Sequence, residues 1–265
     1  MISRDKRSGR PLVLLTNDDG VQALGLLALA QALRGLADLF VIAPDHNWSA
    51  AGHSKTMHKP LRAWMTKLAD GAEAMTTSGS PSDCVAMALL GLLDQTPDLV
   101  VSGVNLGANI GHDLTYSGTV AAAMEGVIGG VPAIAVSLDT YEAGHYDLAA
   151  RFTAQLALRV LAAQLPEPLL LNVNVPALPE KDVRGVQITR LGQRLYRDAL
   201  IKRSDPRGRT YYWIGGDAPG GIVEEGSDFG TLSKGYISVT PILLDLTDYS
   251  KLSLLRGWDL ALPGL

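Results

Sequence analysis

Two adjacent aspartates, Asp18 and Asp19, follow the apolar run at residues 12–16 and precede Gly20. Asn, Asp and Gly commonly form turns, so the tetrapeptide NDDG on its own is typical of a turn. If the apolar run is a buried strand, both carboxylates lie at its carboxyl end, where they repel each other unless a cation sits between them. Oxygen ligands suit a hard cation such as Mg²⁺ or Mn²⁺. The pair therefore predicts a divalent-cation site.

A glycine-punctuated segment at residues 103–113, GVNLGANIGHD, carries two amide side chains, Asn105 and Asn109. Its glycine spacing differs from the dinucleotide-binding fingerprint, and the sequence contains no Walker-type loop. The glycines could provide loop flexibility alone. They would also let the backbone approach a ligand closely, and we expect the two amides to contact that ligand.

Ser117 precedes the helical sequence GTVAAAMEG and is a favourable N-cap residue. Capping alone explains most serines at such a position. The same geometry leaves N–H groups of Gly118 and Thr119 at the positive end of the helix dipole, where a phosphate can bind. We therefore predict that Ser117, Gly118, Thr119 and Asn109 form a phosphate-binding site.

The elements that must position these residues alternate between short apolar runs and helical patterns. Strands are predicted at residues 12–16, 39–43, 98–102, 133–138 and 169–175. Helices are predicted between them, within residues 26–36, 81–93, 118–130 and 146–165. Ser80, Pro81 and Asp83 form the start signal of the second helix.

Unbroken apolar strands that alternate with helices indicate a parallel sheet covered on both faces. Residues 12–180 therefore predict a Rossmann-like, doubly wound α/β core. Ligands bind at the carboxyl ends of the strands in such folds, which is where the polar segments would meet.

The residue pattern changes after residue 184, from alternating strands and helices to strand-like runs. Residues 184–248 contain VQITRL, RTYYWIG and GYISVTPILLDL, which predict strands and a protruding β-hairpin within a single domain spanning residues 1–265. The acidic, glycine-rich stretch at residues 217–230 predicts a mobile loop.

Composition excludes several classes of protein. The 265 residues are 47% hydrophobic with a formal net charge of -4, and no basic cluster suits a nucleic acid duplex. The single cysteine, Cys84, cannot form an intramolecular disulfide and is expected in the core, and the five histidines lack metal-ligand spacing. No apolar run reaches the roughly 18 residues that span a membrane, and the apolar run near the N-terminus is too short for a signal peptide. We expect a cytoplasmic protein.

Five segments resemble, in order, the signatures of SurE-type 5'/3'-nucleotidases: LLTNDDG, APDHNWS, SGSPSDCV, SGVNLGANIGHDLTYSGTVAAAMEG and LNVNVP. They span most of residues 12–176, and GYISVTPILLDLT extends the resemblance towards the C-terminus. The resemblance implies one divalent cation held by Asp18, Asp19, Ser49 and Asn105. It also implies a C-terminal hairpin used in a homodimer or homotetramer, and hydrolysis of nucleoside monophosphates, in some members also of short polyphosphate.

The chain departs from the family pattern beside Ser49. Trp48 and Ala50 stand where the family usually has Arg and Gly, and Leu24 stands where it usually has Pro. Ser49 is kept, so the implied ligand set is complete. Trp48 could stack on a base or pack against its own loop.

The predicted mechanism is cation-assisted attack of water on phosphorus, with Asp18 or Asp19 as proton acceptor. One alternative is a haloacid-dehalogenase-like phosphatase with an aspartyl nucleophile, although that motif separates its aspartates by one residue. The other alternative is a non-catalytic sensor that binds a nucleotide or phosphate at the same place.

Overall fold

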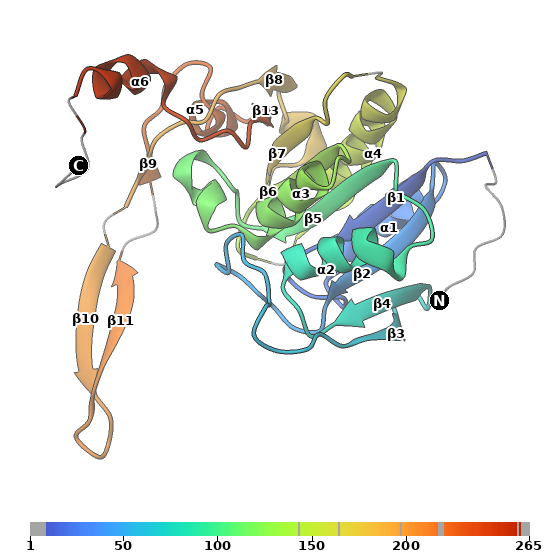
Figure 1. The fold of residues 1–265 in the computed structure, drawn as a ribbon, viewed down its shortest axis with the longest axis horizontal. Coiled ribbons are helices and arrows are strands. Elements are labelled where there is room, and N and C mark those ends of the chain that lie inside the picture. Colours follow the sequence, from blue (N-terminus) through green and yellow to red (C-terminus); the bar gives the residue numbers. More distant parts are fainter. Residues whose placement is uncertain are drawn as a thin grey trace.

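The computed structural model describes residues 9–142, 144–163, 165–196, 198–216, 220–258 and 260. Within these residues the main sheet has nine strands in the order β3-β4-β2-β1-β5-β6-β7-β13-β8 (Figure 1). Its strands are β1 (Leu12–Thr16), β2 (Asp38–Pro44), β3 (Ala63–Lys67), β4 (Glu73–Thr77), β5 (Leu99–Leu106), β6 (Ala133–Asp139), β7 (Leu170–Pro176), β8 (Val186–Ile188) and β13 (Ile237–Ile242).

The sheet is mostly parallel. Strands β4, β2, β1, β5, β6 and β7 pair in parallel, and so do β13 and β8. Strand β3 is antiparallel to β4, and β13 is antiparallel to β7. The predicted α/β fold with a mostly parallel sheet is confirmed.

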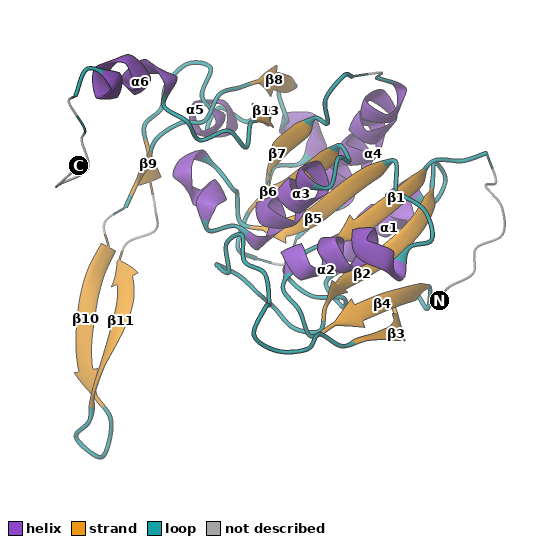
Figure 2. Cartoon of the chain, in the orientation of Figure 1, coloured by secondary structure: helices purple, strands orange, loops and turns teal. Residues whose placement is uncertain are grey.

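Helices cover both faces of the sheet (Figure 2). Helices α1 (Leu24–Leu33) and α4 (Asp147–Ala162) contact each other, and α2 (Pro81–Met87) packs against α3 (Gly118–Ile128). Alternate residues of β1 enter different apolar clusters: Val13 packs with α1 and α4, whereas Leu14 packs with α2 and α3. This alternation is what a strand buried on both faces requires, and the doubly wound arrangement follows from it.

The two predicted helix starts are confirmed. Ser80 caps α2 in a capping box with Asp83, and the Ser117 side chain accepts a hydrogen bond from the Val120 N–H at the start of α3. Short helical turns lie at Ala88–Leu92, Gly111–Thr115 and Glu180–Asp182. In the part of the chain that the structure describes, no helix is long and apolar enough to cross a membrane.

The C-terminal part forms an arm and two further helices. Strands β10 (Asp198–Ser204) and β11 (Thr210–Gly216) pair as an antiparallel hairpin that projects from the body, and β9 (Arg194–Leu195) pairs with β12 (Gly220–Gly221) at its base (Figure 1). Helices α5 (Asp228–Leu232) and α6 (Tyr249–Arg256) follow.

Some predicted elements were wrong. We expected only strands after residue 184, but α5 and α6 are present; each is short and begins at a side-chain cap, Ser227 or Asp248. The stretch predicted as a loop contains β12 and the start of α5, and its residues 217–219 lie outside the described residues. The hairpin of β3 and β4 was not predicted, because β3 is an edge strand without a buried apolar side chain.

Candidate functional site

The two aspartates lie in a turn at the carboxyl end of β1. The buried Asn17 closes this turn: its Nδ2 donates to the Gly20 carbonyl at 3.0 Å, and its Oδ1 accepts from the Gly20 N–H at 3.2 Å. The segment is therefore a turn, as its composition indicates. The turn also presents Asp18 and Asp19 at the edge of the sheet where the other polar segments meet.

Asp18 is 3% exposed and contacts the start of α3. The Thr119 hydroxyl donates to Asp18 Oδ1 at 2.5 Å. Burial, the hydrogen bond from Thr119 and the charge of Asp19 together place the pKa of Asp18 at about 6: burial raises it most, Thr119 opposes the rise and Asp19 adds to it. The Asp18 carboxylate thus lies where a cation would be favourable.

Asp19 is less buried and binds the loop that follows β2. The Asn47 amide donates to Asp19 Oδ1 at 3.1 Å, and Asn47 Oδ1 accepts from the Ser49 N–H at 2.7 Å. The Trp48 N–H donates to the Asp18 carbonyl at 2.8 Å. Burial raises the pKa of Asp19, and hydrogen bonds to the Leu106 backbone and to Asn47 oppose that rise. These contacts hold the exposed Ser49 beside the aspartates.

Asn105 lies inside a strand and not in the loop that we expected, since β5 continues to Leu106. The register of β5 against β6 shifts between Ser102 and Asn105, and such irregularities re-aim side chains next to functional sites. The Asn105 Nδ2 donates to the Gly107 carbonyl at 2.8 Å. With its nitrogen engaged, the amide has its oxygen left to bind a cation.

One open cavity of about 510 Å³ gathers most of the predicted site. Five of the predicted residues line it: Asp18, Ser49, Asn105, Asn109 and Ser117. Gly118 and Thr119 contact Asp18, and Asp19 follows it in the same turn, but none of the three lines the cavity.

The donor set fits a hard cation. Among the described residues, no three His, Cys, Asp or Glu side chains cluster in a way that could hold a metal. The predicted ligands are instead two carboxylates, an amide and a hydroxyl, all of which offer oxygen. Oxygen donors of this kind bind Mg²⁺ and Mn²⁺, which retain water in their remaining positions.

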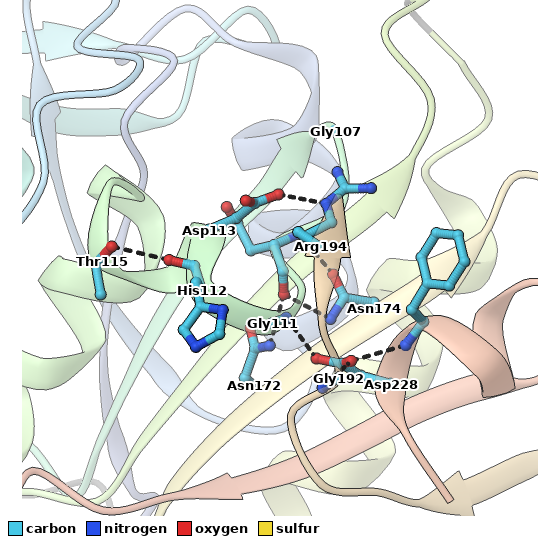
Figure 3. A network of polar contacts seen from close by, with 12 residues as sticks. Gly107, Gly111, His112, Asp113, Thr115, Asn172, Asn174, Gly192, Arg194 and Asp228 are labelled. Carbon is cyan, nitrogen blue, oxygen red and sulfur yellow. Dashed lines mark hydrogen bonds and ion pairs between the residues drawn. The ribbon is translucent and has the colours of Figure 1, made fainter. Parts of the chain in front are cut away.

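Two asparagines of β7, Asn172 and Asn174, hold the glycine segment between Gly107 and Gly111 (Figure 3). Asn174 Oδ1 accepts from the Asn109 N–H at 2.8 Å, and the Asn109 carbonyl accepts from Asn172 at 2.8 Å and from Asn174 at 3.0 Å. The Asn109 side chain donates to Ser137 Oγ at 2.8 Å. Both β7 asparagines are fully buried. We did not predict a role for these two asparagines. Amide side chains within a buried strand need hydrogen-bond partners, however, and this could have indicated that they bind a neighbouring segment.

The C-terminal part also reaches the site, which was not predicted (Figure 3). Arg194 of β9 lines the cavity and donates through Nε to Asp113 Oδ2 at 2.6 Å. Asp228 at the start of α5 is buried and accepts from the N–H groups of Gly111 at 2.8 Å and of Gly192 at 2.7 Å. These contacts fasten the glycine segment to residues far along the chain.

Two buried carboxylates on the helices hold the loop that carries Ser49. Glu125 of α3 lies 3.0 Å from His53 Nε2 and 2.5 Å from Lys55 Nζ. Burial raises the pKa of Glu125, but its contacts with His53 and Lys55 lower it by more. Asp83 of α2 accepts from the N–H and the hydroxyl of Thr56. These contacts of His53, Lys55 and Thr56 anchor the loop to α2 and α3.

Trp48 is half-buried in the same loop. Its ring centroid lies 5.1 Å from that of His46, and it does not line the cavity. This position matches packing within the loop, the second of the two roles considered for Trp48.

The fold and site together define a doubly wound α/β protein with an oxygen-rich candidate site for a cation and a phosphate at the carboxyl edge of its sheet. The sequence model of the family described as survival protein SurE matches residues 13–198. The chain belongs to the SurE family.

Relatives match over nearly the whole chain. The protein named 5'-nucleotidase SurE from Chloroflexus aggregans is 52% identical, over 93% of this chain and 98% of its own. The protein of the same name from Herpetosiphon aurantiacus is 53% identical, over 89% and 93%. The crystal structure of the SurE protein from Aquifex aeolicus superposes with a TM-score of 0.80 at 41% identity, over 93% of this chain and 98% of that one.

Proposed function

We propose that the protein is a 5'-nucleotidase that hydrolyses nucleoside monophosphates to nucleoside and phosphate with the help of a divalent cation. The observation that carries the proposal is the meeting of Asp18, Ser49 and Asn105 in one cavity, with Asp19 beside Asp18. The relatives named 5'-nucleotidase SurE, at about half identity over most of their length, support the same activity.

One Mg²⁺ or Mn²⁺ ion per subunit would be held by Asp18, Asp19, Ser49 and Asn105. A bound cation of this kind offsets charge on a phosphate and makes a water molecule more acidic. Asp18 suits this role because burial and the charge of Asp19 raise its pKa, so a positive charge is favourable beside it.

The residues of the chain would orient the phosphate and accept a proton. Ser117, Gly118, Thr119 and Asn109 are the proposed phosphate contacts, at the positive end of α3. Thr119 would exchange its hydrogen bond with Asp18 for one with the phosphate. One of the two aspartates would accept a proton from the attacking water.

The test is phosphate release from a panel of nucleoside 5'- and 3'-monophosphates and short polyphosphate. The protein would be stripped with EDTA and given back Mg²⁺ or Mn²⁺. We expect release that depends on the cation and is abolished in the Asp19→Asn variant. No release with either cation, from protein shown to be folded, would favour a phosphate-binding sensor. A phosphoenzyme trapped on an aspartate would instead favour the haloacid-dehalogenase-like mechanism.

We further propose that the chain forms a single domain with a catalytic core at residues 12–180. Residues 184–248 would provide the contacts that join copies of the chain into a homodimer or homotetramer. The support is the hairpin of β10 and β11, where Leu200 is 68% exposed, Trp213 63% and Ile214 82%. Apolar side chains on a projecting arm are typical of an interface with another copy. A cytoplasmic location is proposed because the lone Cys84 is a buried free thiol, which suits a reducing compartment.

A further inference from the structure

An aromatic ring lies directly over the glycine segment at the rim of the cavity. Tyr141 follows β6 and lines the cavity together with Asp18 and Asn105. A Cβ added at Gly107 would be 2.9 Å from Tyr141 Cε1, 3.4 Å from Cδ1 and 3.6 Å from Cζ. The ring therefore packs against the backbone of Gly107. Any side chain at position 107 would collide with the ring.

The backbone beneath the ring is fixed. The Gly107 carbonyl accepts from Asn105 Nδ2 at 2.8 Å, and its N–H donates to the Leu138 carbonyl at 3.0 Å. Gly107 also has a φ of 98°, which favours glycine. The Gly107 backbone beneath the ring is thus hydrogen-bonded to residues at the ends of β5 and β6. It belongs to the same segment as the predicted cation ligand Asn105.

The upper surface of the ring is open. Tyr141 is 75% exposed although it is a large aromatic residue. A ring supported on one side and open on the other offers a stacking surface for a planar aromatic group, and bases stack on such rings regardless of their identity. A cavity of about 510 Å³ is in the range that holds a ligand of nucleotide size.

We infer that Tyr141 is the platform on which the nucleobase of the substrate stacks while its phosphate lies at Asp18 and Asn105. This inference rests on the proposed nucleotidase function. Stacking uses the face of the base and not its hydrogen-bonding edge, so the site distinguishes nucleotides from other phosphate monoesters and tolerates different bases.

Two other tyrosines line the cavity but are placed differently. Tyr116 directly precedes Ser117, one of the proposed phosphate contacts. Tyr196 belongs to the arm side of the cavity, after β9. Tyr141 is the ring stacked on the segment between Asn105 and Asn109, so it is the one to vary.

The test compares kcat/KM for AMP, UMP and ribose 5-phosphate, which carries the same phosphate and sugar without a base. In Tyr141→Leu we expect kcat/KM to fall about 10- to 100-fold for AMP and less for UMP, because purines stack more strongly. Ribose 5-phosphate should change by less than about twofold. Tyr141→Phe keeps the ring and should behave as the unsubstituted protein, and Tyr249→Leu makes the same replacement on α6, away from the cavity.

Equal losses for AMP and ribose 5-phosphate in Tyr141→Leu would show that the ring only supports the loop, and unchanged values for all three substrates would show that it does not touch the base. Either result would overturn the inference and leave the nucleotidase function standing. If the unsubstituted protein released no phosphate from any substrate with either cation, the proposed function itself would fail, and the inference with it.

Discussion

Gly118 and the side chain of Asp18 are in direct contact at the start of α3. A Cβ on Gly118 would lie 2.8 Å from Asp18 Cβ and 3.0 Å from its Oδ2. The missing side chain therefore lets the positive end of the helix reach a buried carboxylate. The contact couples the helix that would receive the phosphate to the carboxylate that would hold the cation.

Gly118→Ala should displace Asp18 or the first turn of α3, because the added methyl meets atoms that are themselves buried. Overpacking of this kind lowers the free energy of unfolding by about 1–3 kcal/mol. We expect kcat/KM for AMP to fall at least about 10-fold, since small misplacements of catalytic groups are costly. Steady-state kinetics and urea unfolding measure the two effects. Gly35→Ala is the matched control, as nothing lies within 4 Å of the Cβ position there; equal behaviour of the two variants would contradict the prediction.

Asp18→Asn should stabilise the cation-free protein while abolishing hydrolysis. The pKa of Asp18 is about 6 in the folded state against 3.8 for an unperturbed aspartate, so the folded state binds more protons between these pH values. Stability is therefore lost as pH rises through this window. In EDTA at pH 7.5 the variant should gain about 1–3 kcal/mol in free energy of unfolding, since each pKa unit corresponds to about 1.4 kcal/mol.

Thermal unfolding against pH checks this prediction. At about pH 4 Asp18 is protonated and uncharged, so the gain should vanish there. Added Mg²⁺ should raise the Tm of the unsubstituted protein and leave that of Asp18→Asn almost unchanged. A variant less stable than the parent at pH 7.5 in EDTA would contradict the account of Asp18 as a buried, unfavourable charge.

Asn174→Ala should loosen the glycine segment more than Asn172→Ala. The Asn174 side chain bonds both the N–H and the carbonyl of Asn109, whereas Asn172 bonds only the carbonyl. Loss of Asn174 leaves a buried N–H without a partner, which costs about 1–3 kcal/mol. We expect a larger decrease in both the free energy of unfolding and kcat/KM for Asn174→Ala, measured by urea unfolding and phosphate release. The reverse order would show that the clamp does not act through the Asn109 N–H.

Ile214→Lys should weaken self-association. Ile214 pairs with Leu200 across the hairpin, and both side chains are largely exposed. A buried lysine without a partner is costly at an interface, so the variant should shift towards the monomer at micromolar concentration. Light scattering coupled to size-exclusion chromatography measures the mass. Thr210→Lys, at the exposed start of β11, is the control and should keep the mass of the unsubstituted protein.

The sequence predicted the elements whose burial is complete. The runs that form β1, β2, β6 and β7 are buried on both faces, so each is largely apolar, although β7 also buries Asn172 and Asn174. Strand β3 was not predicted because its side chains, including Trp64 and Met65, are largely exposed. It therefore lacks the run of buried apolar residues that indicates a strand. The serine caps of α2 and α3 were local signals and could be recognised directly.

The candidate site was predictable where its residues follow a strand and unpredictable where it depends on distant contacts. The aspartates could be predicted because they follow β1 and strand ends meet at one edge of a parallel sheet, whereas Asn105 was expected after a strand and lies within β5. The contact of Arg194 with Asp113 joins residues 81 positions apart, and that of Asp228 with Gly111 joins residues 117 positions apart. No local pattern marks either pair, since the partner of each is set by how the C-terminal segment returns across the sheet.

The position of Asp228 late in the chain determines when the site can be completed during synthesis on the ribosome. Synthesis delivers the N-terminal residues first, so the aspartate pair and the glycine segment emerge long before Asp228, which satisfies the Gly111 N–H and bonds Gly192. A nascent chain that carries every proposed cation ligand still lacks the carboxylate that anchors the segment beside them. Completion of the pocket is thus a late step of translation, and fragments released early would not contain a finished site.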